Sequence, residues 1–205
     1  MVNNLEFIIF NLVFFSIGQF TTKRLIKSEN LDGKYIFQTP IFIFYPLIGI
    51  IFLSFFIFLV NFIFPIEVIK DMGHFFGILM ILYFLKINLN SNINFFHIFS
   101  FFIVPFILAF STYNIKFHYD AEAYHLATQA WILNSKITFG LSKFFIWHGH
   151  SSLYDYLQTI LSFQGNFIYQ HYLNLIFFSL LINFIGYHAL FNRSNLFFNA
   201  SLFIL

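Results

Sequence analysis

The sequence predicts an all-α membrane protein: a multi-pass helical bundle with interfacial helices in one large outer loop. Its 205 residues are 60% hydrophobic and only 9% charged, whereas a soluble domain carries about 25% charged residues. A surface with so few charges would expose large apolar patches to water. Apolar runs of membrane-spanning length recur along the chain, and the polar residues gather in one long segment, 114–164. That segment holds three of the eight acidic residues and four of the eight histidines.

Charge and cysteine content exclude several classes of protein. The net charge is +2, and the basic residues form no patch, so no nucleic-acid surface is predicted. The absence of cysteine excludes disulfides, thiolate metal sites and a cysteine nucleophile. Glu6 is the first charged residue of the chain, and Lys23 and Arg24 follow the first apolar run, so no basic segment precedes that run as it would in a cleavable signal peptide. We therefore expect the first run to be a retained membrane helix.

Five apolar segments are predicted spans and a truncated sixth follows: 5–20, 37–64, 73–87, 93–113, 172–190 and 196–205. Ten apolar residues make only about 15 Å of helix, half of the hydrocarbon core. We therefore expect a single transmembrane domain over 1–205 that is incomplete at its C-terminus. Pro46 is expected to kink the second span or to mark the start of its regular helix.

The distribution of basic residues predicts the orientation. One set of alternate connections holds Lys23, Arg24, Lys27, Lys34, Lys86 and Arg193, and the other holds Lys70, Lys116, Lys136 and Lys143. The larger set is expected on the cytoplasmic side. This places the N-terminus and the 114–165 loop outside.

Two helices are predicted in that loop. The first covers 120–134, with Asp120 at its N-cap, Glu122 in its first turn, and a lipid- or bundle-facing side that includes Ala127 and Ala130. The second covers 153–163. Irregular backbone between them must be buried in protein or line a wet cavity. We therefore expect a substrate site at this loop.

The run Asp120-Ala-Glu122-Ala-Tyr124-His125, directly after a predicted span, resembles the acidic motif in the first large outer loop of GT-C-type integral membrane glycosyltransferases. The wider spacing is similar to that of a bacterial group of multi-pass membrane proteins with this fold, through Trp131, Gly140, Leu141, Ser151 and Ser152. The likeness covers about 117–158. One feature departs from the family: its catalytic loop follows the first span, whereas here the loop follows the fourth predicted span.

The resemblance implies an enzyme of a bacterial inner membrane that assembles cell-envelope glycans. It would bind the bilayer and a lipid-linked sugar, and would transfer the sugar from a polyprenyl-phosphate donor. Asp120 would be the general base that deprotonates the acceptor hydroxyl, and Glu122 would orient the acceptor or the base. The resemblance fixes neither the sugar nor the oligomeric state.

Residue chemistry and position add candidate substrate contacts: Tyr124, His125, Trp131, Lys143, His148 and His150. Lys143, His148 or His150 would neutralise the leaving phosphate. Trp131 or Trp147 would stack on a sugar ring.

Some of these candidate residues also have an alternative interpretation that involves no catalysis or substrate binding. Asp120 also suits a helix N-cap, and Glu122 suits a solvated first-turn acid. His148 and His150 suit either a divalent metal or interfacial hydrogen bonds, and no metal ligands are assigned. Two other functions also stay open: a transporter or flippase of lipid-linked sugars, which the nearly charge-free spans argue against, and a non-catalytic membrane subunit.

Overall fold

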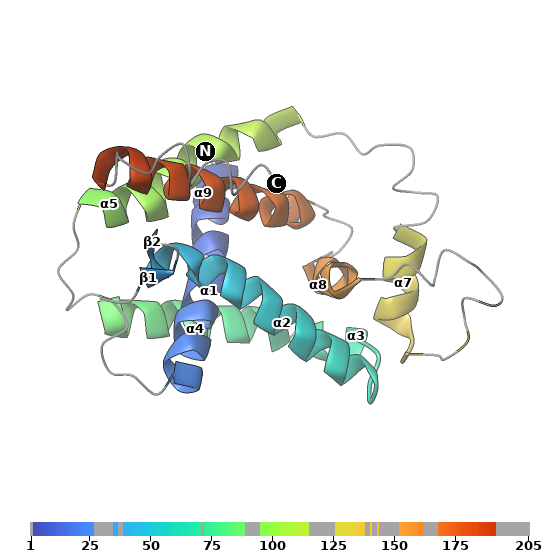
Figure 1. Cartoon of the computed structure of the whole chain (residues 1–205). Coiled ribbons are helices and arrows are strands. Elements are labelled where there is room, and N and C mark those ends of the chain that lie inside the picture. Colours follow the sequence, from blue (N-terminus) through green and yellow to red (C-terminus); the bar gives the residue numbers. More distant parts are fainter. Residues whose placement is uncertain are drawn as a thin grey trace.

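The computed structural model of the chain describes residues 2–26, 35–36, 39–70, 72–88, 95–114, 126–137, 140, 143, 152–161 and 168–191. These residues are almost wholly helical, which confirms the all-α prediction (Figure 1). The elements in chain order are α1 (Val2–Ile26), β1 (Tyr35–Ile36), β2 (Thr39–Pro40), η1 (Ile41–Phe44), α2 (Tyr45–Asn61), α3 (Glu67–Lys70), α4 (Met72–Asn88), α5 (Phe95–Ile98), η2 (Phe99–Ile103), α6 (Val104–Ala109), η3 (Phe110–Asn114), α7 (Leu126–Asn134), α8 (Leu153–Leu161) and α9 (Ile168–Phe191). β1 and β2 form a two-residue antiparallel hairpin that the sequence did not predict.

Within the part of the chain that the structure describes, four helical segments are long and apolar enough to cross a membrane: Leu5–Leu25, Ile41–Asn61, Phe95–Tyr113 and Tyr169–Phe191. A shorter apolar helix covers Phe75–Ile87. The protein is therefore an integral, multi-pass membrane protein, and each of the five complete predicted segments is largely helical. The predicted sixth segment, 196–205, lies outside the described residues.

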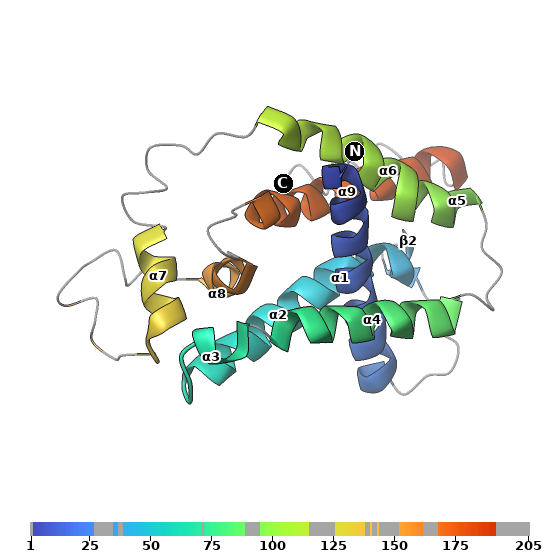
Figure 2. The ribbon, with the colours of Figure 1, turned by 180° about the vertical axis from the view of Figure 1, so that it is seen from behind.

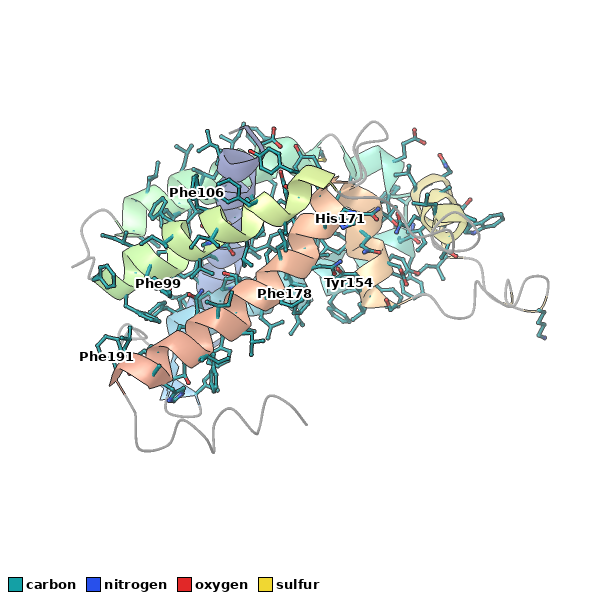
Figure 3. All side chains as sticks on the ribbon, turned by 90° about the horizontal axis from the view of Figure 1, so that it is seen from above. Phe99, Phe106, Tyr154, His171, Phe178 and Phe191 are labelled. Carbon is teal, nitrogen blue, oxygen red and sulfur yellow. The ribbon has the colours of Figure 1, made fainter. Side chains whose placement is uncertain are left out.

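The first helix is longer than predicted, because α1 continues through Lys23 and Arg24. Long basic side chains at a helix end can reach the lipid headgroups, so they do not have to terminate the helix. Exposed phenylalanines cover the outer surfaces of α6 and α9, among them Phe106, Phe178 and Phe191 (Figure 3). These side chains suit contact with lipid.

Prolines shape two of the spans. Pro46 lies in the first turn of α2, directly after η1, so it marks the start of the regular helix, as one of the two expectations had it. Pro105 has no N–H to donate to the carbonyl of Phe101. The turn before it widens into the π-helix η2, in which the Val104 N–H donates to the Phe99 carbonyl. A widened turn of this kind is a common response to a break in the helical hydrogen-bond ladder.

Helix α1 is the centre of the bundle. It packs against α2, α4 and α6, and it runs upright in Figures 1 and 2 while α4 and α9 run across the view. Its closest approach is to α2. A Cβ on Gly18 would lie 1.8 Å from the Tyr45 carbonyl oxygen, and one on Gly49 would lie 2.1 Å from the Phe14 carbonyl oxygen. The two backbones therefore touch, as in membrane helix pairs that meet through small residues.

Contacts between distant residues sort the helix ends into two groups. At the strand end, Thr39 Oγ1 and His188 Nε2 share a 2.8 Å hydrogen bond. At the loop end, the rings of Phe7 and Tyr172 lie 5.2 Å apart, so the start of α1 meets the start of α9. Asn61, at the end of α2, also lies there, in contact with α7. The start of α1 thus contacts the start of α9, and the end of α2 contacts the described part of the loop. Which side of the membrane this end faces stays a prediction.

Candidate functional site

The C-terminal end of α7 is fastened to the bundle by Asn61. Its Nδ2 donates to the carbonyl oxygens of Ile132, at 3.3 Å, and Ser135, at 2.9 Å. The backbone N–H of Ile137 donates in return to the Asn61 carbonyl at 3.1 Å. Asn61 is only 1% exposed. One buried amide therefore satisfies backbone carbonyls that α7 leaves without partners at its end.

A chain of glutamines connects three helices at the loop end. Gln170 Nε2 of α9 donates to Gln129 Oε1 of α7 at 2.7 Å, and Gln129 Nε2 donates to Gln158 Oε1 of α8 at 3.1 Å. The protein-facing side of α7 thus carries polar residues, whereas Ala127 and Ala130 of the predicted apolar side are exposed. Buried amide hydrogen bonds fix a relative arrangement that apolar packing alone leaves adjustable.

Helix α8 begins at Leu153, as predicted, because Ser152 and Asp155 cap it. Asp155 Oδ2 accepts from the Ser152 backbone N–H at 2.7 Å and from its hydroxyl at 3.0 Å. The backbone N–H of Asp155 donates in return to Ser152 Oγ at 3.4 Å, which completes the reciprocal arrangement of a capping box. Tyr154 points toward α9 (Figure 3) and its hydroxyl donates to Asn174 Oδ1. Burial raises the pKa of Tyr154 to about 12, so the phenol keeps its proton. Figures 1 and 2 show α8 between α7 and the bundle.

An apolar cavity of about 310 Å³, which we call the α1 cavity, lies against α8. Its walls come from α1, α2, α4, α8 and α9, and α8 contributes Ile160 and Leu161. Along α1 it extends from Glu6 to Ile17, about 16 Å at the rise of an α-helix. Glu6 and Tyr169 are the polar side chains among the described residues that line it. The cavity therefore suits a hydrocarbon chain with a polar group at its loop end.

Glu6 marks that polar end. Its Oε2 accepts a hydrogen bond from the Tyr172 hydroxyl at 3.4 Å. The four long candidate spans contain no other Asp or Glu. An acid inside a membrane segment is a functional candidate by default. Sequence reasoning missed Glu6 as a site residue, although its isolation within a span was the available signal.

Most of the predicted site residues lie outside the described residues: Asp120, Glu122, Tyr124, His125, His148 and His150. Their roles therefore stay predictions. Trp131, on α7, is 40% exposed, and Lys143 is also exposed. Neither lines the α1 cavity, so a sugar-stacking role for Trp131 also stays a prediction. Over the described ranges, no group of three His, Cys, Asp or Glu residues is placed to hold a metal ion.

Comparison of the chain with protein-family models, curated proteins and solved structures gives no match.

Proposed function

We propose that the protein is a GT-C-like membrane glycosyltransferase, and that the α1 cavity holds part of the hydrocarbon chain of its polyprenyl-phosphate donor. One observation carries the proposal. A long apolar cavity extends from Ile17 to Glu6, and Ile160 and Leu161 of the polar loop form part of its wall. Apolar lining favours a hydrocarbon occupant. The loop that forms this wall is the same one that carries the acidic motif.

The donor would lie with its chain in the cavity and its phosphate beyond the loop end. The carboxylate of Glu6 would repel a phosphate placed beside it. We therefore expect the phosphate on the loop side of Glu6, and we propose that Lys143, His148 or His150 of the loop contacts it there. A cation there would offset the charge of the leaving group.

Transfer would then take place in the loop. Asp120 takes the proton of the acceptor hydroxyl while the acceptor oxygen forms a bond to the anomeric carbon of the sugar. The bond from that carbon to the phosphate oxygen breaks, and the lipid phosphate leaves with the electron pair. Glu122 orients the acceptor or the base. The roles of Asp120 and Glu122 rest on the motif, and the cavity supports the proposed binding of the lipid chain.

A variant that fills the cavity tests the proposal. Gly77 lines the α1 cavity, and a Cβ placed on it meets no atom within 4 Å. The indole of Gly77→Trp would occupy the cavity without displacing the backbone. Leu82, on the same helix, is 56% exposed and does not line the cavity, so Leu82→Trp is the matched control.

Binding of a fluorescent polyprenyl phosphate is measured with both variants and wild type in nanodiscs. We expect the affinity of Gly77→Trp to fall at least tenfold and that of Leu82→Trp to stay within twofold of wild type. Equal binding by all three proteins would overturn the proposal. Displacement of the probe by ordinary phospholipid as effectively as by unlabelled polyprenyl phosphate would overturn it too, because the cavity would then be a general lipid site.

A further inference from the structure

Three buried polar atoms inside the bundle come from three different helices. They are Asn11 Oδ1 of α1, Ser100 Oγ of η2 and Asn183 Oδ1 of α9. The residues are 2%, 2% and 7% exposed, respectively. None of these three atoms has a hydrogen-bond partner within the described part of the chain. Burial of a polar atom without a partner is strongly unfavourable, above all in a membrane.

All three residues line one small cavity of about 10 Å³. It shares no lining residue with the α1 cavity, and it is separate from the proposed donor site. A cavity of this size holds about one water molecule, provided that two to four polar partners surround it. The volume and the polar lining of this cavity therefore both suit one water molecule.

We propose that this cavity binds a single water molecule that links α1, η2 and α9. The water would donate one hydrogen bond to Asn11 Oδ1 and one to Asn183 Oδ1, and would accept one from the Ser100 hydroxyl. Two donors and one acceptor are what the three atoms require. Asn183 Nδ2 donates to Ser179 Oγ at 3.4 Å, which orients the amide so that its oxygen remains for the water.

The lining favours water over a cation. Among its side chains, Ser179 adds one further oxygen, and the remaining polar lining comes from the three residues already named. No carboxylate is present among the described lining residues to balance a positive charge. An ion without a counter-charge in a low-dielectric interior carries a large desolvation penalty.

The water would connect the central helix to a part of the fold that is not a regular α-helix. Ser100 lies within the π-helix that precedes Pro105, where the backbone is widened. A bridging water joins side chains on different helices through its hydrogen bonds, without a direct contact between those side chains. Loss of the water should therefore remove a hydrogen bond from Asn11 and from Asn183 at the same time.

Magnetisation transfer from water in ¹⁵N-labelled protein in bilayers tests the site directly. We expect cross-peaks between water and the side-chain amide protons of both Asn11 and Asn183. Absence of both cross-peaks would overturn the proposal. Loss of the Asn11 cross-peak in Asn183→Leu, with the fold retained, would support a shared water.

Thermal unfolding gives an independent test. Asn11→Leu and Asn183→Leu each remove one partner of the water, so each should lower the unfolding midpoint. The double variant should lower it by less than the sum, because the water is already lost in either single variant. Asn11→Leu combined with Ser54→Ala is the matched control, since Ser54 is buried but bonded to the Ile50 carbonyl at 2.6 Å. That pair should be additive.

Additive losses at Asn11 and Asn183 would overturn the proposal. If the leucine variants do not fold, Ser100→Ala and Asn183→Ala provide a milder cycle with the same expectation. Replacement of sodium chloride by choline chloride should leave the wild-type midpoint unchanged. A sodium-dependent rise would overturn the water assignment in favour of a cation.

Discussion

The hydroxyl of Tyr172 donates a hydrogen bond to Glu6 Oε2 across 3.4 Å, although 166 residues separate the two in the chain. The contact joins the start of α1 to the start of α9. It also holds the one acid of the long candidate spans at the polar end of the α1 cavity.

Tyr172→Phe should therefore destabilise the protein by about 1 kcal/mol, the usual net contribution of such a hydrogen bond. Unfolding in mild detergent measures the change. Glu6→Gln should destabilise the Tyr172→Phe variant less than it destabilises wild type, because the variant has already lost the hydrogen bond between the two residues. Independent effects of the two substitutions would show that the contact contributes nothing.

The crossing of α1 and α2 predicts a strict requirement for glycine. Gly18→Ala and Gly49→Ala each place a methyl group within about 2 Å of a backbone carbonyl oxygen. A backbone carbonyl cannot move aside as a flexible side chain can. Each variant should therefore lower the free energy of unfolding by about 3 kcal/mol or more, beyond the usual cost of overpacking. Gly77→Ala is the control, since its Cβ meets nothing within 4 Å. It should be neutral or slightly stabilising. Tolerance of alanine at Gly18 would contradict the packing.

The attachment of α7 predicts the effect of Asn61→Leu. The substitution removes the side-chain amide that donates to the Ile132 and Ser135 carbonyls. The free energy of unfolding should therefore fall by about 2 kcal/mol. Thermal unfolding measures the loss. Asn134→Ala, on the exposed side of α7, should change stability by no more than about 0.5 kcal/mol. Equal effects of the two would mean that Asn61 does not hold the helix.

Tyr154 predicts a change in stability at alkaline pH. Burial raises its pKa to about 12 from the ordinary value of 10, so the folded state favours the neutral phenol. Its contribution is complete below pH 10 and is lost as the pH rises toward 12. The difference between the absorbance titrations of wild type and Tyr154→Phe should therefore show one phenol ionising near pH 12. A midpoint near 10 would show that the side chain is not buried against α9.

The spans were predictable because each depends on local composition. The apolar runs predicted the helices, Pro46 marks the start of α2 as one of two expectations had it, and α8 begins at Leu153 as predicted. Arg24 misled the prediction of the end of α1, since a basic residue at a membrane interface is compatible with continued helix.

The contacts that build the site were not predictable in the same way. Asn61 meets Ile132 across 71 residues, and Gln129 meets Gln170 across 41. Neither pair leaves a periodic signal, because only the tertiary fold brings the helices together. Asp120 and Glu122 were proposed from the motif, and the structure describes the parts of the chain on either side of them.

The central claim is sugar transfer from a polyprenyl-phosphate donor with Asp120 as the base. It is tested most directly by transfer of a radiolabelled sugar from that donor to an acceptor, with purified protein in vesicles. The account predicts transfer by wild type and by Glu67→Gln, whose acid lies exposed in the first turn of α3. It predicts at least a thousandfold loss in folded Asp120→Asn. Full activity of Asp120→Asn, or movement of the lipid-linked sugar across the vesicle membrane without transfer, would contradict it.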